Sequence, residues 1–145
     1  MKAWYFAPED RRLRFGDGRK VAPGVTHTIE GTPMLCEHGL HASQSILDAL
    51  VHAPGPILCR VELAGEMCSG SNKVAAQSRT YLRVADTTNV LREFARAQAL
   101  SVAHLWDMSD IVREYLETGD EAMRAAAGAA ADAASAAAWD AASAA

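Results

Sequence analysis

Residues 35–66 constrain the fold most, because the spacing of their apolar residues changes within this one segment. Residues 46–50 have apolar side chains at helical spacing, and Ser43 or Ser45 is placed to cap the first turn. The break Pro54-Gly55-Pro56 ends this short helix. The pattern therefore predicts a turn followed by a short helix that ends before residue 54.

Residues 57–63 read ILCRVEL, and their apolar side chains alternate as in a strand with one buried face. We expect this to be the central strand of a sheet, followed by a polar loop over residues 65–72. Residues 2–7, 25–30 and 81–84 have the composition of further strands. A hairpin is expected around Gly16-Asp17-Gly18, because its turn positions favour glycine. The predicted fold class is α+β, a small mixed or antiparallel sheet with a short helix.

The chain changes character after residue 86, and we expect three parts: a sheet domain over 1–86, a helical extension over 87–119 packed on it, and an alanine-rich helix over 120–145. The extension has two helical patterns, the second ending at Gly119 in a C′ position. Sixteen of the residues 122–145 are alanine, which favours a helix by intrinsic propensity. Its small side chains allow close approach of another helix, so homo-oligomer formation through 120–145 is one expectation, and a solitary low-complexity helix is the other.

Composition limits the class of partner and compartment. The formal net charge is -4, which disfavours a general phosphate-binding surface, so we do not expect direct binding of nucleic acid. The basic cluster over residues 11–20 is interpreted as the solvated face of the hairpin, with a nucleic-acid or nucleotide-phosphate site as the alternative. Cys36, Cys59 and Cys68 cannot all pair internally, and no apolar run is long enough to cross a membrane. A reduced cytoplasm without membrane attachment is therefore predicted.

Cys36, His38 and His41 form a C-x-H-x-x-H cluster of zinc-competent side chains, but the spacing matches no standard structural zinc site. A cysteine nucleophile with a histidine base at 27, 38 or 52 is a second alternative, against a default of inert thiols. The chain has no P-loop, GxGxxG, HExxH or GxSxG motif. We therefore predict no metal ligands and no catalytic residues.

Several short segments over residues 1–86 resemble an uncharacterised domain family of bacteriophages and prophages, whose members often have an alanine-rich tail. The segments that carry this resemblance are WYF at 4–6, the turn at 16–18, LCEHGLHAS at 35–43, DAL at 48–50, VELAGE at 61–66 and KVAA at 73–76. The resemblance implies expression inside an infected bacterium, and hence a location in the host cytoplasm.

A second pattern is similar to ADP-ribosyltransferases. It consists of Gly39-Leu40-His41-Ala42-Ser43, a short helix over 45–50, a break at 54–56 and a strand over 61–66. This resemblance implies a split sheet that holds NAD between its halves. It would place His41 against the nicotinamide, Ser43 beside it, and Arg14 or Arg19 at the pyrophosphate.

The chain departs from that family at the positions that carry catalysis. No His-Gly or Arg-Gly pair stands near Tyr5 to hold the NAD ribose. Where a catalytic glutamate would stabilise positive charge on the ribose, the chain has Thr80, and a Gln-x-Glu variant becomes Gln77-x-Arg79. We therefore expect that transfer activity is lost even if the fold is shared.

Three functions follow as expectations. The first is a phage-encoded accessory protein without enzymatic activity or cofactor, which binds and inhibits a host or defence macromolecule; anti-CRISPR inhibition is its sharpest version. The second is an NAD-dependent ADP-ribosyltransferase or an NAD-binding protein, using His41, Ser43, Arg14 and Arg19. The third is a virion or scaffold component that assembles through its alanine-rich helix.

Overall fold

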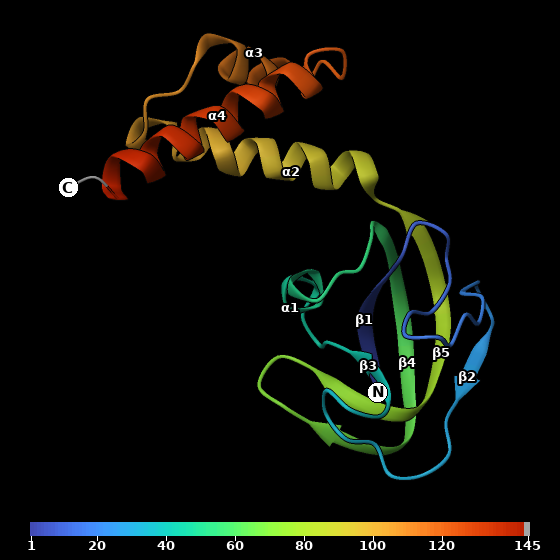
Figure 1. Ribbon diagram of the computed structural model, residues 1–145. Helices are drawn as coiled ribbons and strands as arrows, with labels where there is room; N and C mark the ends of the chain where they lie inside the picture. Colours follow the sequence, from blue (N-terminus) through green and yellow to red (C-terminus); the bar gives the residue numbers. More distant parts are fainter. Residues whose placement is uncertain (144–145) are drawn as a thin grey trace. The chain divides into compact units, whose positions relative to one another are not determined.

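Two long strands form the centre of the sheet in the computed structural model, which describes residues 1–143 (Figure 1). β4 (Ile57–Ser69) pairs antiparallel with β5 (Val74–Asp86). The alternate residues Ile57, Cys59, Val61 and Leu63 are buried, which confirms the expected period of two. The predicted loop over 65–72 is confirmed only for residues 70–72, because a register shift between Ala64 and Met67 lets β4 continue to Ser69.

Three shorter strands complete an antiparallel sheet. β1 (Lys2–Ala7) pairs with β4, whereas β2 (Thr26–Thr28) and β3 (Leu40–Ala42) pair with successive parts of β5. The order is β1-β4-β5-β2, with β3 off this path beside β5. The expected strand over 25–30 is shorter than predicted, and β3 lies where the sequence predicted only a turn. With the helices described below, the fold class is α+β.

The short helix α1 (Ile46–Val51) follows β3, and Ser45 caps it by accepting a hydrogen bond from the amide of Leu47 at 3.2 Å. Just before the helix, Ser43 exchanges backbone hydrogen bonds with Trp4 at 2.7 and 2.8 Å. This bridge joins the end of β3 to β1, although β1 and β3 lie on opposite sides of the β4–β5 pair. The predicted helix and one of its two candidate caps are confirmed.

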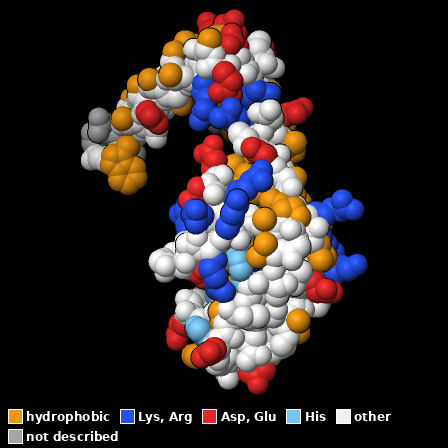
Figure 2. All heavy atoms as spheres, turned by 90° about the vertical axis from the view of Figure 1, so that its right-hand side faces the viewer, with side chains coloured by type: hydrophobic (Ala, Val, Ile, Leu, Met, Phe, Trp, Pro, Cys, Tyr) orange, Lys and Arg blue, Asp and Glu red, His pale blue; other side chains and the backbone are white. Residues whose placement is uncertain are grey.

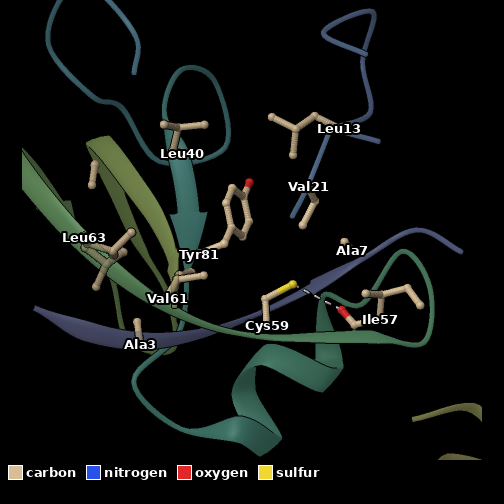
Figure 3. Close-up of a cluster of buried hydrophobic side chains, with 13 residues drawn as sticks. Ala3, Ala7, Leu13, Val21, Leu40, Ile57, Cys59, Val61, Leu63 and Tyr81 are labelled. Atoms are coloured by element: carbon tan, nitrogen blue, oxygen red, sulfur yellow. Dashed lines mark hydrogen bonds between the residues drawn. The ribbon is translucent and has the colours of Figure 1, made fainter. Parts of the chain in front are cut away.

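The core of the sheet unit is built on one face of β4 and β5 (Figure 3). Val61 and Tyr81 are fully buried, and the loop residue Val21 packs in the same cluster. The ring of Tyr81 rises from β5 so that its hydroxyl points toward the space between Leu40 and Leu13 (Figure 3). The ring is thus part of the apolar core, while its hydroxyl forms hydrogen bonds with His27 and Arg79.

The segment 10–21 turns back on itself through one isolated bridge between Arg12 and Lys20, without forming a regular strand. Gly16 and Gly18 have φ of 80° and 65°, which fits the predicted turn. Arg12 is exposed and donates to the carbonyl of Gly18 at 3.0 Å. On the visible face of the sheet unit, positive and negative side chains are interspersed (Figure 2).

The chain divides into two compact units, Met1–Thr88 and Asn89–Ala145. The helices are α2 (Thr88–Ser101), the 3-10 helix η1 (Ala103–Leu105), α3 (Asp110–Thr118) and α4 (Arg124–Ser143). Gly119 ends α3 with a φ of 69° in the left-handed region, as predicted. Of the predicted alanine-rich helix, residues 144–145 lie outside the described residues, and packing of 87–119 on the sheet stays a prediction.

A small core holds the second unit together. Val112 of α3 and Ala127 of α4 are buried with Met108, which precedes α3. Arg92 of α2 forms an ion pair with Glu121 at 3.1 Å, which joins α2 to the turn before α4. A search of the helices over residues 1–143 finds no segment with both the length and the apolar character of a membrane span.

Candidate functional site

A cavity of about 520 Å³ opens in the sheet unit beside β1 and β3. Three consecutive residues of β1, Trp4 to Phe6, form part of its wall. The rest comes from the turn at 13–17, the segment at 36–43, the end of α1, and two basic residues near or on β5, Lys73 and Arg79. The cavity thus combines aromatic rings with positive charge, and it depends on segments that are distant in sequence.

Three of the four predicted site residues line this cavity: Arg14, His41 and Ser43. Arg14 is exposed and donates to the carbonyl of Pro54 at 2.8 Å, which places the turn close to the end of α1. Arg19 is not among the lining residues. Its guanidinium forms an ion pair with Asp17 at 2.7 Å and donates to the carbonyl of Thr28 at 2.8 Å.

His41 is held as a neutral ring by its surroundings. The backbone N–H of Cys36 donates to Nε2 of His41 at 3.2 Å, so this nitrogen carries no proton. Burial lowers the pKa of His41 below its ordinary value, and the nearby Lys73 ammonium lowers it further. Because Nε2 already accepts this hydrogen bond, a ligand in the cavity would not find it free.

Arg79 is a functional candidate that sequence reasoning missed. It lies on β5, is 2% exposed, and lines the cavity. Nε and Nη2 donate to the hydroxyl of Tyr81 at 3.1 and 2.7 Å, and Nη1 donates to the carbonyl of His41. The centre of its guanidinium lies 3.8 Å from the ring centroid of Tyr5, a cation–π contact. One sequence signal could have indicated Arg79. It is two residues from Tyr81, so both side chains lie on the same face of a strand.

Tyr81 links Arg79 to a buried histidine. Its hydroxyl accepts two hydrogen bonds from Arg79, so its own proton is donated to Nδ1 of His27 at 3.1 Å. Burial raises the pKa of Tyr81 to about 12 and, together with Arg19 and Arg79, lowers the pKa of His27. At neutral pH this network therefore contains neutral Tyr81 and neutral His27 beside the charged Arg79.

The cysteine and histidine side chains of the C-x-H-x-x-H segment do not converge. The Lys73 ammonium lies 3.0 Å from the sulfur of exposed Cys36, and the His38 ring bonds the carbonyl of Glu30 at 2.7 Å. In the described part of the chain, no three His, Cys, Asp or Glu side chains are grouped so that they could hold a metal ion. The hydrogen bond between Cys36 and the His41 ring comes from the backbone N–H of Cys36 and not from its thiol. A cysteine nucleophile with His27, His38 or His52 as base stays an untested alternative.

The cavity contains one carboxylate among its described lining residues, that of Asp17. Oδ1 of Asp17 accepts from Nε of Arg19 and Oδ2 accepts from Nη2, each at 2.7 Å. The Arg19 guanidinium accordingly lowers the pKa of Asp17. The arrangement suits recognition of an anion with a flat ring, and it leaves no free carboxylate in the lining to stabilise a developing cation.

Comparison with known proteins gives a match to a domain family. The family model of a domain of unknown function, DUF7666, matches residues 13–93. The matched segment includes Arg14, His41, Lys73 and Arg79, and begins after β1. Neither a curated protein nor a solved structure matches the chain. The resemblances to phage proteins and to ADP-ribosyltransferases stay predictions. Because the match covers more than half of its residues, the chain belongs to the uncharacterised family DUF7666.

Proposed function

We propose that the protein binds a nucleotide of the NAD class in the cavity beside β1 and β3, without catalysing its cleavage. The observation that carries this proposal is the convergence of Arg14, His41 and Ser43 on one cavity. The resemblance to ADP-ribosyltransferases predicts these residues as an NAD site, and they come from two segments that are distant in sequence, 13–17 and 36–43.

The size and chemistry of the cavity support a ligand of this class. Its volume of about 520 Å³ lies within the range of small-molecule sites, roughly 300–1,000 Å³. Tyr5 lines the cavity and is the aromatic candidate for contact with a flat base, whereas the Trp4 ring packs against Arg60 on the opposite face of β1. Arg14 and Lys73 offer positive charge for phosphate groups. A nucleotide combines these two requirements in one molecule.

We expect no cleavage of NAD because the carboxylate of Asp17 is already bonded by Arg19. Transfer of ADP-ribose generates positive charge on the ribose, which a free carboxylate would stabilise. Asp17 is the carboxylate in the described lining, and Arg19 bonds both of its oxygens. Inhibition of a host or defence macromolecule and assembly through 120–145 stay predictions, which this binding function does not require.

The test is calorimetric titration of the full-length protein with NAD, with nicotinamide and ADP-ribose as partial ligands. We expect saturable heat with NAD. The Arg14→Gln variant should bind about tenfold more weakly, because it loses a charge-assisted contact to phosphate. Arg83→Gln is the matched control, because Arg83 lies on β5, is exposed, and does not line the cavity.

Two results would contradict the proposal. Absence of heat with NAD at millimolar concentration would remove the binding function. Nicotinamide released from NAD during prolonged incubation, measured by chromatography, would show that the protein is an enzyme and that the role assigned to Asp17 is wrong.

A further inference from the structure

Arg79 is a buried cation to which the described side chains offer no partner of opposite charge. The residue is 2% exposed, and the ion pairs among the described side chains do not include it. Removing a charge from water is costly unless it is paired, so buried charges in proteins normally have a counterion. The charge of Arg79 therefore requires an explanation beyond the packing of the sheet.

The ionisable groups around Arg79 cannot supply the missing negative charge. Burial raises the pKa of Tyr81 to about 12 and that of the Cys59 thiol to about 11. Burial also raises the pKa of Tyr5, which stacks on the guanidinium. These three groups are neutral at physiological pH, and His27, with its lowered pKa, is neutral as well. Of the ionisable groups around Arg79, none supplies a counterion, so a bound anion is the remaining source of one.

The guanidinium also retains hydrogen-bonding capacity. Arginine has five N–H donors, and three of those of Arg79 bond to Tyr81 and to the carbonyl of His41. One N–H on each terminal nitrogen remains without a partner among the residues that the structure describes. Tyr5 covers one face of the guanidinium plane, and Arg79 lines the cavity, so these donors are available to a molecule inside it.

We infer that Arg79 is the anchor for an anionic oxygen group, a phosphoryl or a carboxylate, on the molecule that occupies the cavity. Two oxygens of such a group match two N–H donors on neighbouring nitrogens of a guanidinium. Arg14 and Lys73 line the same cavity and add to its positive potential. This inference rests on the proposed function and makes it more specific, because a neutral molecule of the same shape would leave Arg79 unpaired.

The first experiment measures binding to the wild-type, full-length protein at constant ionic strength. The probes are pyrophosphate, benzoate, and benzamide, the neutral amide analogue of benzoate. We expect at least one of the two anions to bind. If benzoate binds, the affinity for benzamide should be at least tenfold lower. Binding of pyrophosphate alone identifies the group as phosphoryl, and binding of benzoate alone identifies it as carboxylate. If neither anion binds, the inference is overturned.

The second experiment locates the anion. Arg79→Lys keeps the charge but loses the paired donors, and should weaken anion binding about 10- to 100-fold. Arg83→Lys on the exposed part of the same strand should leave it unchanged. Because a substitution of buried Arg79 can impair folding, the Nε–H resonance of Arg79 in isotope-labelled wild-type protein is followed during the pyrophosphate or benzoate titration. A resonance that stays in place while the anion binds would overturn the inference.

The two proposals fail in distinguishable ways. If NAD binds equally well to the wild type and to folded Arg79→Lys, the nucleotide function stands and the role of Arg79 is wrong. If an anion binds in an Arg79-dependent way but NAD does not, the anchor stands and the nucleotide class is wrong.

Discussion

The polar network of Arg79, Tyr81 and His27 determines the protonation states in the sheet unit. Each hydrogen bond in this network has one possible direction, because the guanidinium can only donate and the single proton of the Tyr81 hydroxyl must go to His27. Such a fully bonded buried network favours one conformation, and it is sensitive to the loss of any one partner. Its most accessible property is the titration of His27.

His27 predicts a loss of stability in mild acid. Its pKa in the folded protein is lowered from the ordinary 6.5, chiefly by burial and then by Arg19 and Arg79. The unfolded chain therefore binds the proton more readily. Stability is fully present above about pH 6.5 and is lost as the pH falls through the folded pKa. Asp17, the facing group of opposite charge, only partly offsets this effect.

The measurement is hydrogen exchange of the β4 and β5 amides at pH 7.5 and pH 5, corrected for intrinsic exchange rates. We expect the wild type to lose protection at pH 5 and His27→Gln to lose less. A residual loss in the variant is expected, because the pKa of His41 is lowered in the same direction. The control is His104→Gln, which removes an exposed imidazole in the helical unit. An unchanged pH dependence in His27→Gln would show that His27 does not titrate with folding.

At the scale of elements, one glycine in each unit affects stability, and the two have opposite effects. Gly55 is needed for close packing, whereas Gly128 weakens a helix. Gly55 stands in the break after α1, where an added Cβ would lie 2.7 Å from Cα of Pro8 and 2.9 Å from the backbone nitrogen of Glu9. The close approach of two backbones explains why this break contains a glycine. Gly128 lies inside α4, and an added Cβ would meet nothing within 4 Å.

Alanine at these two positions should change stability with opposite signs. Gly55→Ala should destabilise the sheet unit by about 1–3 kcal/mol, because the backbone at residues 8–9 must move. Gly128→Ala should stabilise α4 by up to about 1 kcal/mol, because alanine has the higher helix propensity. Thermal unfolding of each variant beside the wild type provides the measurement. If Gly55→Ala is more stable than the wild type, the backbone of residue 55 does not lie as close to residues 8–9 as in this structure.

At the scale of the whole molecule, each unit has its own hydrophobic core. The sheet unit is built around Val61 and Tyr81, and the helical unit around Met108, Val112 and Ala127. The second core is small, since alanine buries little apolar area. Separate cores of different size lead us to expect that the units unfold separately.

Differential scanning calorimetry of the full-length protein should accordingly show two transitions. Gly55→Ala should shift one of them and Gly128→Ala the other, which assigns each transition to a unit. A single transition that both substitutions shift would contradict independent unfolding. NAD or pyrophosphate, if bound in the cavity, should raise the temperature of the sheet transition alone, since binding stabilises the unit that contains the site.

Local patterns in the sequence predicted much of this protein. Burial of alternate residues over 57–63, the helix after Ser45 and the end of α3 at Gly119 depend on side-chain period and on backbone preferences that act within a few residues. The α+β class followed from these elements. Residues His41, Ser43 and Arg14 were predicted as site residues through a resemblance, and no local physical rule placed them together in one cavity.

Only the tertiary structure decided the rest. β3 exists because residues 40–42 find a partner in β5, and β4 passes through a predicted loop because a bulge keeps its pairing with β5. Arg79 shows the same limit for the site. An arginine in a strand normally reaches solvent, and its burial beside Tyr5 and Tyr81 without a counterion depends on contacts between β1 and β5. Such contacts join segments that are far apart in the chain. Local sequence patterns therefore cannot predict them, and only the fold brings the residues of the cavity together around Arg79.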